Sequence, residues 1–162
     1  MTNILIASDH KLFRESLTRL LSVQPFFHVT GVCADTHAAI TIASREQPHL
    51  VLIDGSSDPL SAIQATKKIV ASSTANVIAI SGIPDSSFAS HMLDAGALGY
   101  LTKQSLAKEI ITAIQEVAKD NCYSCLDNNP VFHPVPTPKA MARIKEPATP
   151  GIFWHRILQF AN

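Results

Sequence analysis

The strongest constraint on this chain is a pattern that recurs five times: a short apolar run, a polar residue or loop, then apolar residues at helical spacing. The expected strands cover residues 3–7, 28–34, 49–53, 77–80 and 99–101. The expected helices follow at residues 12–21, 35–47, 63–70, 88–95 and 106–117. Alternation of strands and helices predicts a parallel sheet, because parallel neighbours need a long crossover connection.

The expected strands show little alternation between polar and apolar side chains. A strand of this kind needs an apolar layer on both faces, which helices provide in a doubly covered sheet. We therefore predict an α/β fold with a five-stranded parallel sheet and helices on both faces. An antiparallel sandwich would favour alternating strands and is the weaker interpretation.

The composition changes after Asp120, where six of the ten prolines fall: Pro130, Pro134, Pro136, Pro138, Pro147 and Pro150. Proline removes backbone donors and interrupts helices and sheets. We therefore predict one domain over residues 1–120 and a Pro-rich linker over residues 121–162, disordered or extended up to residue 151. Residues 152–160 are apolar again and are expected to dock, either as a lid on the domain or as a dimer clasp.

The charge balance is even, with 13 Lys and Arg against 13 Asp and Glu, and no local basic patch is visible. Direct binding to DNA is therefore not expected from this chain alone. The sequence shows no apolar run long enough to span a membrane and no export signal. Its three cysteines are then expected to be reduced thiols, and the expected location is the cytoplasm.

Polar residues directly follow four of the expected strands, at the edge where an open parallel sheet forms its ligand crevice. They are Ser8 and Asp9, Asp54, Ser81, and Lys103. Two carboxylates can bind a hard cation such as Mg²⁺, while a lysine and a hydroxyl can bind phosphoryl oxygens. One aspartate at a strand end is often only a turn or cap residue, so the combination carries this prediction.

Four segments in this order, residues 4–14, 49–54, 77–82 and 95–103, resemble the receiver domains of bacterial two-component response regulators. The first contains Asp-His-x-Leu-Phe-Arg, and the last contains Ala-Gly-Ala-x-Gly-Tyr-Leu-x-Lys. These two motifs are most similar to receivers that precede LuxR-type helix–turn–helix output domains. The resemblance implies a flavodoxin-like fold for residues 1–120 and a role in two-component signal transduction.

The resemblance also implies the chemistry of the crevice. Asp54 would accept a phosphoryl group from a histidine kinase or a phosphotransfer protein in a phosphorelay. Asp9, Asp54 and the backbone carbonyl of Ser56 would bind Mg²⁺, and Lys103 would contact the phosphoryl group. Because the donor supplies the phosphohistidine and the receiver assists only its own modification, we do not expect an enzyme.

Two further residues would carry the signal to a partner surface. The resemblance implies that Ser81 moves to hydrogen-bond the phosphoryl group and that Tyr100 is the switch aromatic. Tyr100 also lies in a short apolar strand, where an aromatic ring can simply pack in the core. The surface expected to change comprises residues 88–114, and a homodimer is possible.

Three departures from the family pattern leave a second interpretation open. Ser8 stands where the family usually has the first acid of an acidic pair. Residues 55–59 replace the usual Met-Pro loop, and Ala62 replaces the usual glycine. The alternative is a pseudo-receiver, an interaction module that signals without phosphorylation. A small enzyme using the same crevice is disfavoured, because the sequence has no nucleophile elbow or flavin-phosphate loop.

Overall fold

The computed structural model describes residues 1–126 and 129–133, the side chains only as far as Ser124. Its first ten elements alternate between strands and helices, as the sequence predicts. They are β1 (Thr2–Ala7), α1 (Lys11–Ser22), β2 (Phe27–Cys33), α2 (Thr36–Glu46), β3 (Leu50–Asp54), α3 (Pro59–Ser72), β4 (Asn76–Ser81), α4 (Ser86–Asp94), β5 (Gly99–Thr102) and α5 (Ala107–Val117). The next two elements are the strands β6 (Cys122–Leu126) and β7 (Asn129–His133).

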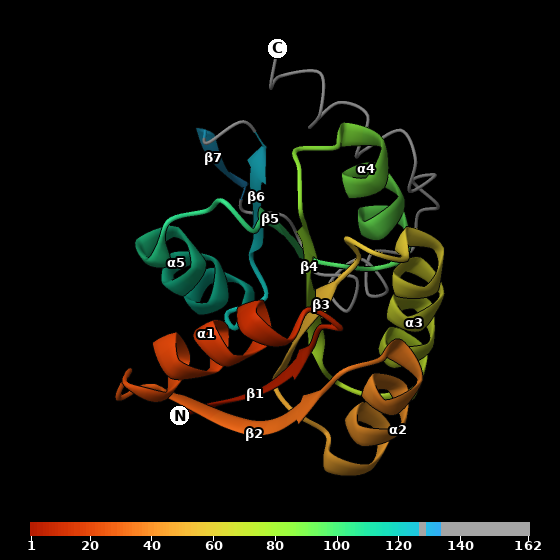
Figure 1. The fold of residues 1–162 in the computed structure, drawn as a ribbon, viewed down its shortest axis with the longest axis vertical. Coiled ribbons are helices and arrows are strands. Elements are labelled where there is room, and N and C mark those ends of the chain that lie inside the picture. The colour runs from red at the N-terminus through yellow and green to blue at the C-terminus, as the bar shows by residue number, and fades with distance from the viewer. Residues whose placement is uncertain (127–128, 134–162) are drawn as a thin grey trace, which may run out of the picture.

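The strands form one sheet in the order β2-β1-β3-β4-β5-β6-β7. The first five are parallel, which confirms the α/β class and the flavodoxin-like arrangement. In this order β3 lies between β1 and β4, and β5 lies on the other side of β4 (Figure 1). The carboxyl ends of β1, β3, β4 and β5, and the residues that follow them, therefore lie next to one another on one edge of the sheet.

Helices cover both faces of the sheet, with α1 and α5 on one side and α2, α3 and α4 on the other (Figure 1). Within β3, Leu50 and Leu52 pack towards α1 and α5, while Val51 and Ile53 pack towards the other three helices. All four side chains are at most 1% exposed. Burial of both faces explains why the strand sequences do not alternate.

Polar residues next to the strands define where most of the helices begin. Asp35, Asp58 and Asp85 each accept a hydrogen bond from the backbone N–H three residues later, at the start of α2, α3 and α4. Such caps satisfy amide groups that have no partner within the helix. Pro59 occupies the first turn of α3, where proline loses no helical hydrogen bond. The caps therefore define where α2, α3 and α4 begin.

The sheet is larger than the five strands expected, and the prediction of a linker directly after Asp120 is wrong for β6 and β7. β6 pairs with β5 in parallel, and β7 returns antiparallel beside β6. Cys122 and Tyr123 are buried in the core next to α5, which explains why this segment joins the sheet. Pro130 lies in β7, opposite Cys125, within a hairpin that tolerates it.

The remainder of the predicted tail, including residues 152–160, lies outside the described residues. The lid and the dimer clasp therefore stay predictions. In the part of the chain that the structure describes, no helix is long and apolar enough to cross a membrane.

Candidate functional site

Asp54 is the last residue of β3 and the centre of a polar cluster at the carboxyl edge of the sheet. Lys103 Nζ lies 2.7 Å from its Oδ2, and the Ser8 hydroxyl donates a hydrogen bond of 2.6 Å to the same oxygen. The other oxygen, Oδ1, accepts hydrogen bonds from the Ser56 hydroxyl at 2.5 Å and from the Ser56 backbone N–H at 3.0 Å. Both oxygens of one carboxylate are thus surrounded by donors.

The surroundings of Asp54 favour its ionised form. Burial of the side chain, which is 1% exposed, opposes ionisation. Hydrogen bonds from Lys103, Ser56 and Ser8 outweigh that effect and hold the pKa of Asp54 below its usual value. The result is a buried carboxylate that stays charged at neutral pH, as a nucleophilic oxygen must be.

Lys103 is oriented by groups from three elements. Its backbone N–H donates to the carbonyl of Ser81 at 2.8 Å, which holds the start of the loop after β5 against the end of β4. Its ammonium group lies 5.0 Å from the centre of the Phe13 ring, on α1, in a cation–π contact. Lys103 remains 19% exposed, so its side chain contacts Asp54 and is still partly accessible to solvent.

Ser8 is a direct partner of Asp54 and not only a departure from a family pattern. It is buried, and its hydroxyl accepts the His10 backbone N–H at 3.2 Å while donating to Asp54. Its carbonyl accepts a hydrogen bond from the Arg14 guanidinium group. Sequence reasoning placed Ser8 at the correct edge but missed the contacts of Arg14 and Phe13.

The Ser56 side chain is another contact that sequence reasoning missed, since only the backbone carbonyl was predicted to take part. An aspartate side chain commonly accepts the backbone N–H two residues later, so the Asp-x-Ser spacing was an available signal that Ser56 lies against the Asp54 carboxylate.

Asp9 lies next to the cluster but outside its hydrogen-bond network. Its side chain is exposed, and among the described residues it makes no hydrogen bond or ion pair. The oxygen donors of Asp9, Asp54 and the Ser56 carbonyl are of the kind that Mg²⁺ prefers. In the described part of the chain, no group of three or more His, Cys, Asp or Glu side chains could hold a metal ion. Independently of that finding, oxygen donors of this kind fit a hard cation that keeps several waters as its other ligands.

Ser81 ends β4 beside the site but is turned away from Asp54. Its hydroxyl donates to the carbonyl of Ile83 at 2.7 Å. The hydroxyl of Tyr100 donates to the same carbonyl at 3.3 Å and accepts the backbone N–H of Asp85 at 3.2 Å. Ser81 and Tyr100, the two residues predicted to act as a switch, therefore share one acceptor in the loop between β4 and α4.

Tyr100 is fully buried, and its ring packs edge-on against Phe88 with the ring centres 6.2 Å apart. This position matches the expectation of a core aromatic. Whether the ring also switches stays a prediction.

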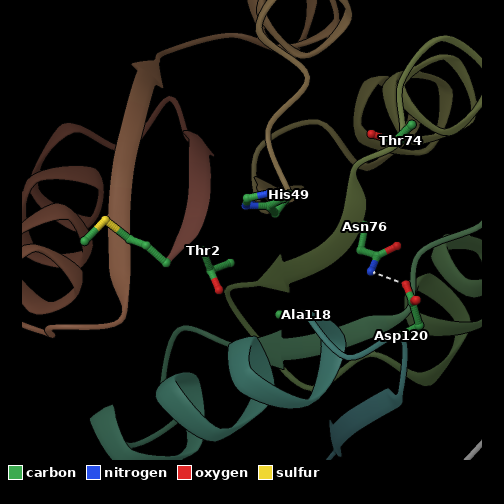
Figure 2. Close-up of a pocket in the computed structure, with 7 residues that line it drawn as sticks. Thr2, His49, Thr74, Asn76, Ala118 and Asp120 are labelled. Carbon is green, nitrogen blue, oxygen red and sulfur yellow. Dashed lines mark hydrogen bonds between the residues drawn. The ribbon is translucent and has the colours of Figure 1, made fainter.

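A second polar region lies at the opposite, amino-terminal end of the strands, around a cavity of about 420 Å³ (Figure 2). The Asn76 side-chain amide donates to the carboxylate of Asp120 at 2.8 Å and to the carbonyl of Val117 at 2.7 Å. His49 Nδ1 accepts the backbone N–H of Asn3 at 2.9 Å. These bonds connect loops and strand ends. They do not converge on one carboxylate, as the bonds at Asp54 do.

Residues 4–115 match the family described as the response regulator receiver domain. The transcriptional regulatory protein DegU of Brevibacillus brevis is 31% identical over 121 residues, which are 74% of this chain and 51% of DegU. LiaR of Bacillus subtilis is 32% identical over 120 residues, which are 74% of this chain and 57% of LiaR. The chain thus spans about half the length of these curated relatives.

Solved structures show the same likeness. The signal receiver domain of the response regulator NarL from Mycobacterium tuberculosis aligns with a TM-score of 0.69 and 28% identity, covering 73% of this chain and 96% of that one. A LuxR-family two-component response regulator from Aurantimonas sp. SI85-9A1 aligns with a TM-score of 0.71 and 26% identity, covering 79% and 91%. With the family match over most of the chain, these findings show that this protein belongs to the response regulator receiver family.

Proposed function

We propose that this chain accepts a phosphoryl group on Asp54 from the phosphohistidine of a histidine kinase or phosphotransfer protein. The observation that carries the proposal is the buried, ionised carboxylate of Asp54, with the Lys103 ammonium group 2.7 Å away. In the proposed transfer, an Asp54 oxygen forms a bond to phosphorus as the phosphorus–nitrogen bond of the donor breaks. The donor imidazole leaves with the electron pair and takes a proton from solvent.

The other residues of the cluster have positioning roles in this proposal. The Lys103 ammonium group would hold an oxygen of the incoming phosphoryl group and offset its negative charge. Ser8 and Ser56 bond to opposite oxygens of Asp54 and so restrict the rotation of the carboxylate. Asp9, Asp54 and the Ser56 carbonyl would hold Mg²⁺, which when bound would supply positive charge at the transferring group.

The consequence of modification in this proposal is a changed protein-interaction surface formed by α4, β5 and α5. Ser81 would turn from the Ile83 carbonyl to the phosphoryl group, which would leave Tyr100 as the remaining side-chain donor to that carbonyl. The proposal includes an action in the cytoplasm and allows a homodimer through this surface. Direct DNA binding is not part of it.

The test is incubation with acetyl phosphate and Mg²⁺, followed by intact mass measurement and peptide mapping. We expect one added phosphoryl group on Asp54 and none in Asp54→Asn. The matched control is Asp120→Asn, which changes a carboxylate at the other end of the sheet and should be modified like the native chain. Equal modification of Asp54→Asn would move the acceptor elsewhere and overturn the proposal.

A pseudo-receiver that signals without phosphorylation is the second candidate. Two observations favour it: Ser8 occupies the place beside Asp54, and both oxygens of Asp54 already accept hydrogen bonds. Beryllofluoride, a phosphoryl analogue, separates the two candidates. If the native chain with Mg²⁺ does not bind beryllofluoride and is not modified by acetyl phosphate, the pseudo-receiver is the better description.

A further inference from the structure

The residue after Asp54 is Gly55, and the ring of Phe88 occupies the space where a side chain at this position would lie. A Cβ atom added to Gly55 would lie 2.2 Å from Cζ of Phe88 and 3.0 Å from each Cε atom. The tip of the Phe88 ring therefore lies directly on the Gly55 backbone. The Gly55 N–H donates to the Ile80 carbonyl at 2.9 Å, so Gly55 is held between β4 and the ring.

Phe88 belongs to α4 and is itself firmly placed. It is 5% exposed, and its backbone N–H donates to the Asp85 cap at 3.0 Å. Its ring meets the Tyr100 ring edge-on at an interplanar angle of 67°. The backbone of Asp85 in turn donates to the Tyr100 hydroxyl at 3.2 Å. One side chain thus contacts the acceptor loop at one end and the buried tyrosine at the other.

Two separate routes lead from Asp54 towards Tyr100. One is polar and runs through the hydroxyl of Ser81 and the Ile83 carbonyl, but Ser81 has no bond to Asp54 in this structure. The other is apolar and continuous, through Gly55 and Phe88. Close-packed groups transmit displacements because they leave little space for independent movement.

We propose that Phe88 is a positioning residue that couples the backbone at Gly55 to Tyr100 and the start of α4. As a route for the phosphorylation signal, this inference rests on the function proposed above. A change in the conformation of Asp54 and Gly55 on modification presses on or releases the Phe88 ring. The ring then changes its packing on Tyr100, independently of Ser81.

The first test needs no phosphoryl group. Gly55→Ala places a methyl group where the ring lies, and it should change the NMR signals of the Tyr100 ring and the Asp85 amide. The same Gly55→Ala change is then made in a Phe88→Leu background, which keeps a buried apolar side chain but removes the ring. There the signals should shift by at most about one third as much. Equal shifts in the two backgrounds would overturn the coupling.

Met92→Leu is the matched control, because Met92 is also buried on α4. The atoms nearest to a Cβ at Gly55 all belong to Phe88 and none to Met92. It should leave the response of Tyr100 to Gly55→Ala unchanged. Thermal unfolding of every variant identifies any that fails to fold. If Gly55→Ala is itself unfolded, the native and Phe88→Leu chains still give the second test.

The second test adds beryllofluoride and Mg²⁺. Phe88→Leu should bind beryllofluoride with a Kd within about threefold of native, because it leaves Ser8, Ser56 and Lys103, the polar partners of Asp54, unchanged. Its Tyr100 and Asp85 signals should nevertheless lose most of the native response. A full response in Phe88→Leu would refute the signal route. Absence of binding in the native chain, together with absence of modification by acetyl phosphate, would instead refute the proposed function, while the first test would still decide the coupling.

Discussion

The two ends of the parallel strands carry similar polar residues and use them differently. At the carboxyl end, Ser8 and Lys103 both direct their polar groups to the buried carboxylate of Asp54. At the amino end, Asn76 and Asp120 bond to each other beside an open cavity and connect a strand to the end of α5 (Figure 2). Polar side chains that converge on one reactive group indicate a site for chemistry. Polar side chains that only hydrogen-bond to their neighbours indicate that they hold loops in place.

The two ends also differ in the cost of losing a partner. The Asp54 side chain is 1% exposed, and its partner Lys103 is 19% exposed. Near the amino end, Lys119 pairs with Glu116 at 3.0 Å, but Lys119 is 65% exposed. A buried charge without its partner is strongly unfavourable, whereas an exposed one is solvated by water. The same substitution should therefore have different effects at the two ends.

Lys103→Ala is expected to have the largest effect. It should slow the modification of Asp54 by acetyl phosphate by about 100-fold, because a preorganised positive group at the transferring atoms contributes on this scale. It should also lower the free energy of unfolding at neutral pH by about 2 kcal/mol, since Asp54 would lose a charged hydrogen-bond partner. Mass spectrometry over time and urea unfolding measure the two effects.

The control is Lys119→Ala. Lys119 is 65% exposed and Glu116 is 20% exposed, so water reaches both charges and the loss should be below about 1 kcal/mol, with no change in modification rate. Similar effects of the two lysine substitutions would contradict the distinction between the two ends.

Ser8→Asp should sharpen the description of the carboxyl end. A second carboxylate beside Asp54 supplies an oxygen that can bond to metal-bound water, so we expect Mg²⁺ affinity to rise by about tenfold. Without Mg²⁺ the variant should be less stable than native, because two carboxylates would repel each other and the Ser8 hydrogen bond would be lost. Calorimetric titration with Mg²⁺ and thermal unfolding with and without the cation provide the measurements.

Asp9→Asn in the native and Ser8→Asp chains tests the origin of that gain. Removal of a direct oxygen ligand should weaken Mg²⁺ binding in both. If Asp9→Asn leaves Mg²⁺ binding unchanged, the proposed ligand set is wrong. If Ser8→Asp binds Mg²⁺ no more tightly than native, Ser8 does not limit cation binding.

The convergence of Asp54, Lys103 and Ser8 could be predicted from the sequence, because adjacent parallel strands end at one edge and each of these residues lies at or directly after a strand end. Their pairwise bonds could not. Whether a hydroxyl turns towards a carboxylate depends on rotamers and on the loop path. Ser56 turns towards Asp54, and Ser81 turns away to Ile83.

The outer strands and the Phe88 contact lay beyond sequence reasoning for a different reason. The prolines of the tail suggested a linker, but Cys122 and Tyr123 precede them and find a buried place beside α5. The contact of Phe88 with Gly55 joins a residue of α4 to a residue of the loop after β3, and no periodicity within one segment predicts such a contact. Element types follow from local pattern, whereas these contacts follow from how the elements pack.

The pH dependence of stability should also distinguish the two ends. The folded-state pKa of Asp54 is lowered, so its contribution to stability is present above the usual value of 3.8 and is lost as the pH falls through the folded value. The stability difference between native and Asp54→Asn chains should therefore shift in favour of Asp54→Asn below pH 3.8. Urea unfolding at several pH values measures this difference.

Glu116 and Asp58 also have lowered pKa values, but both remain in the two chains and their contributions should cancel. A constant difference between the native and Asp54→Asn chains would mean that the hydrogen bonds to Asp54 do not favour its ionised form.

Asp120→Gly is expected to have the smallest effect, and it tests whether the amino end only closes loops. Asp120 has a φ of 66°, in the left-handed region that glycine adopts without strain. Glycine would relieve about 1 kcal/mol of backbone strain and lose the exposed hydrogen bond from Asn76, which contributes about the same amount. The backbone bond from the N–H of residue 120 to the Val117 carbonyl would remain.

The free energy of unfolding of Asp120→Gly should therefore stay within about 0.5 kcal/mol of native, after the greater flexibility of the unfolded glycine chain is included. Asp120→Ala loses the same hydrogen bond and keeps the strain, so it should be less stable than Asp120→Gly by about 1 kcal/mol. Urea unfolding at neutral pH compares the three chains. If glycine and alanine destabilise equally, the carboxylate of Asp120 and not its backbone conformation sets the stability of this end, and the two ends of the sheet are more alike than their geometry indicates.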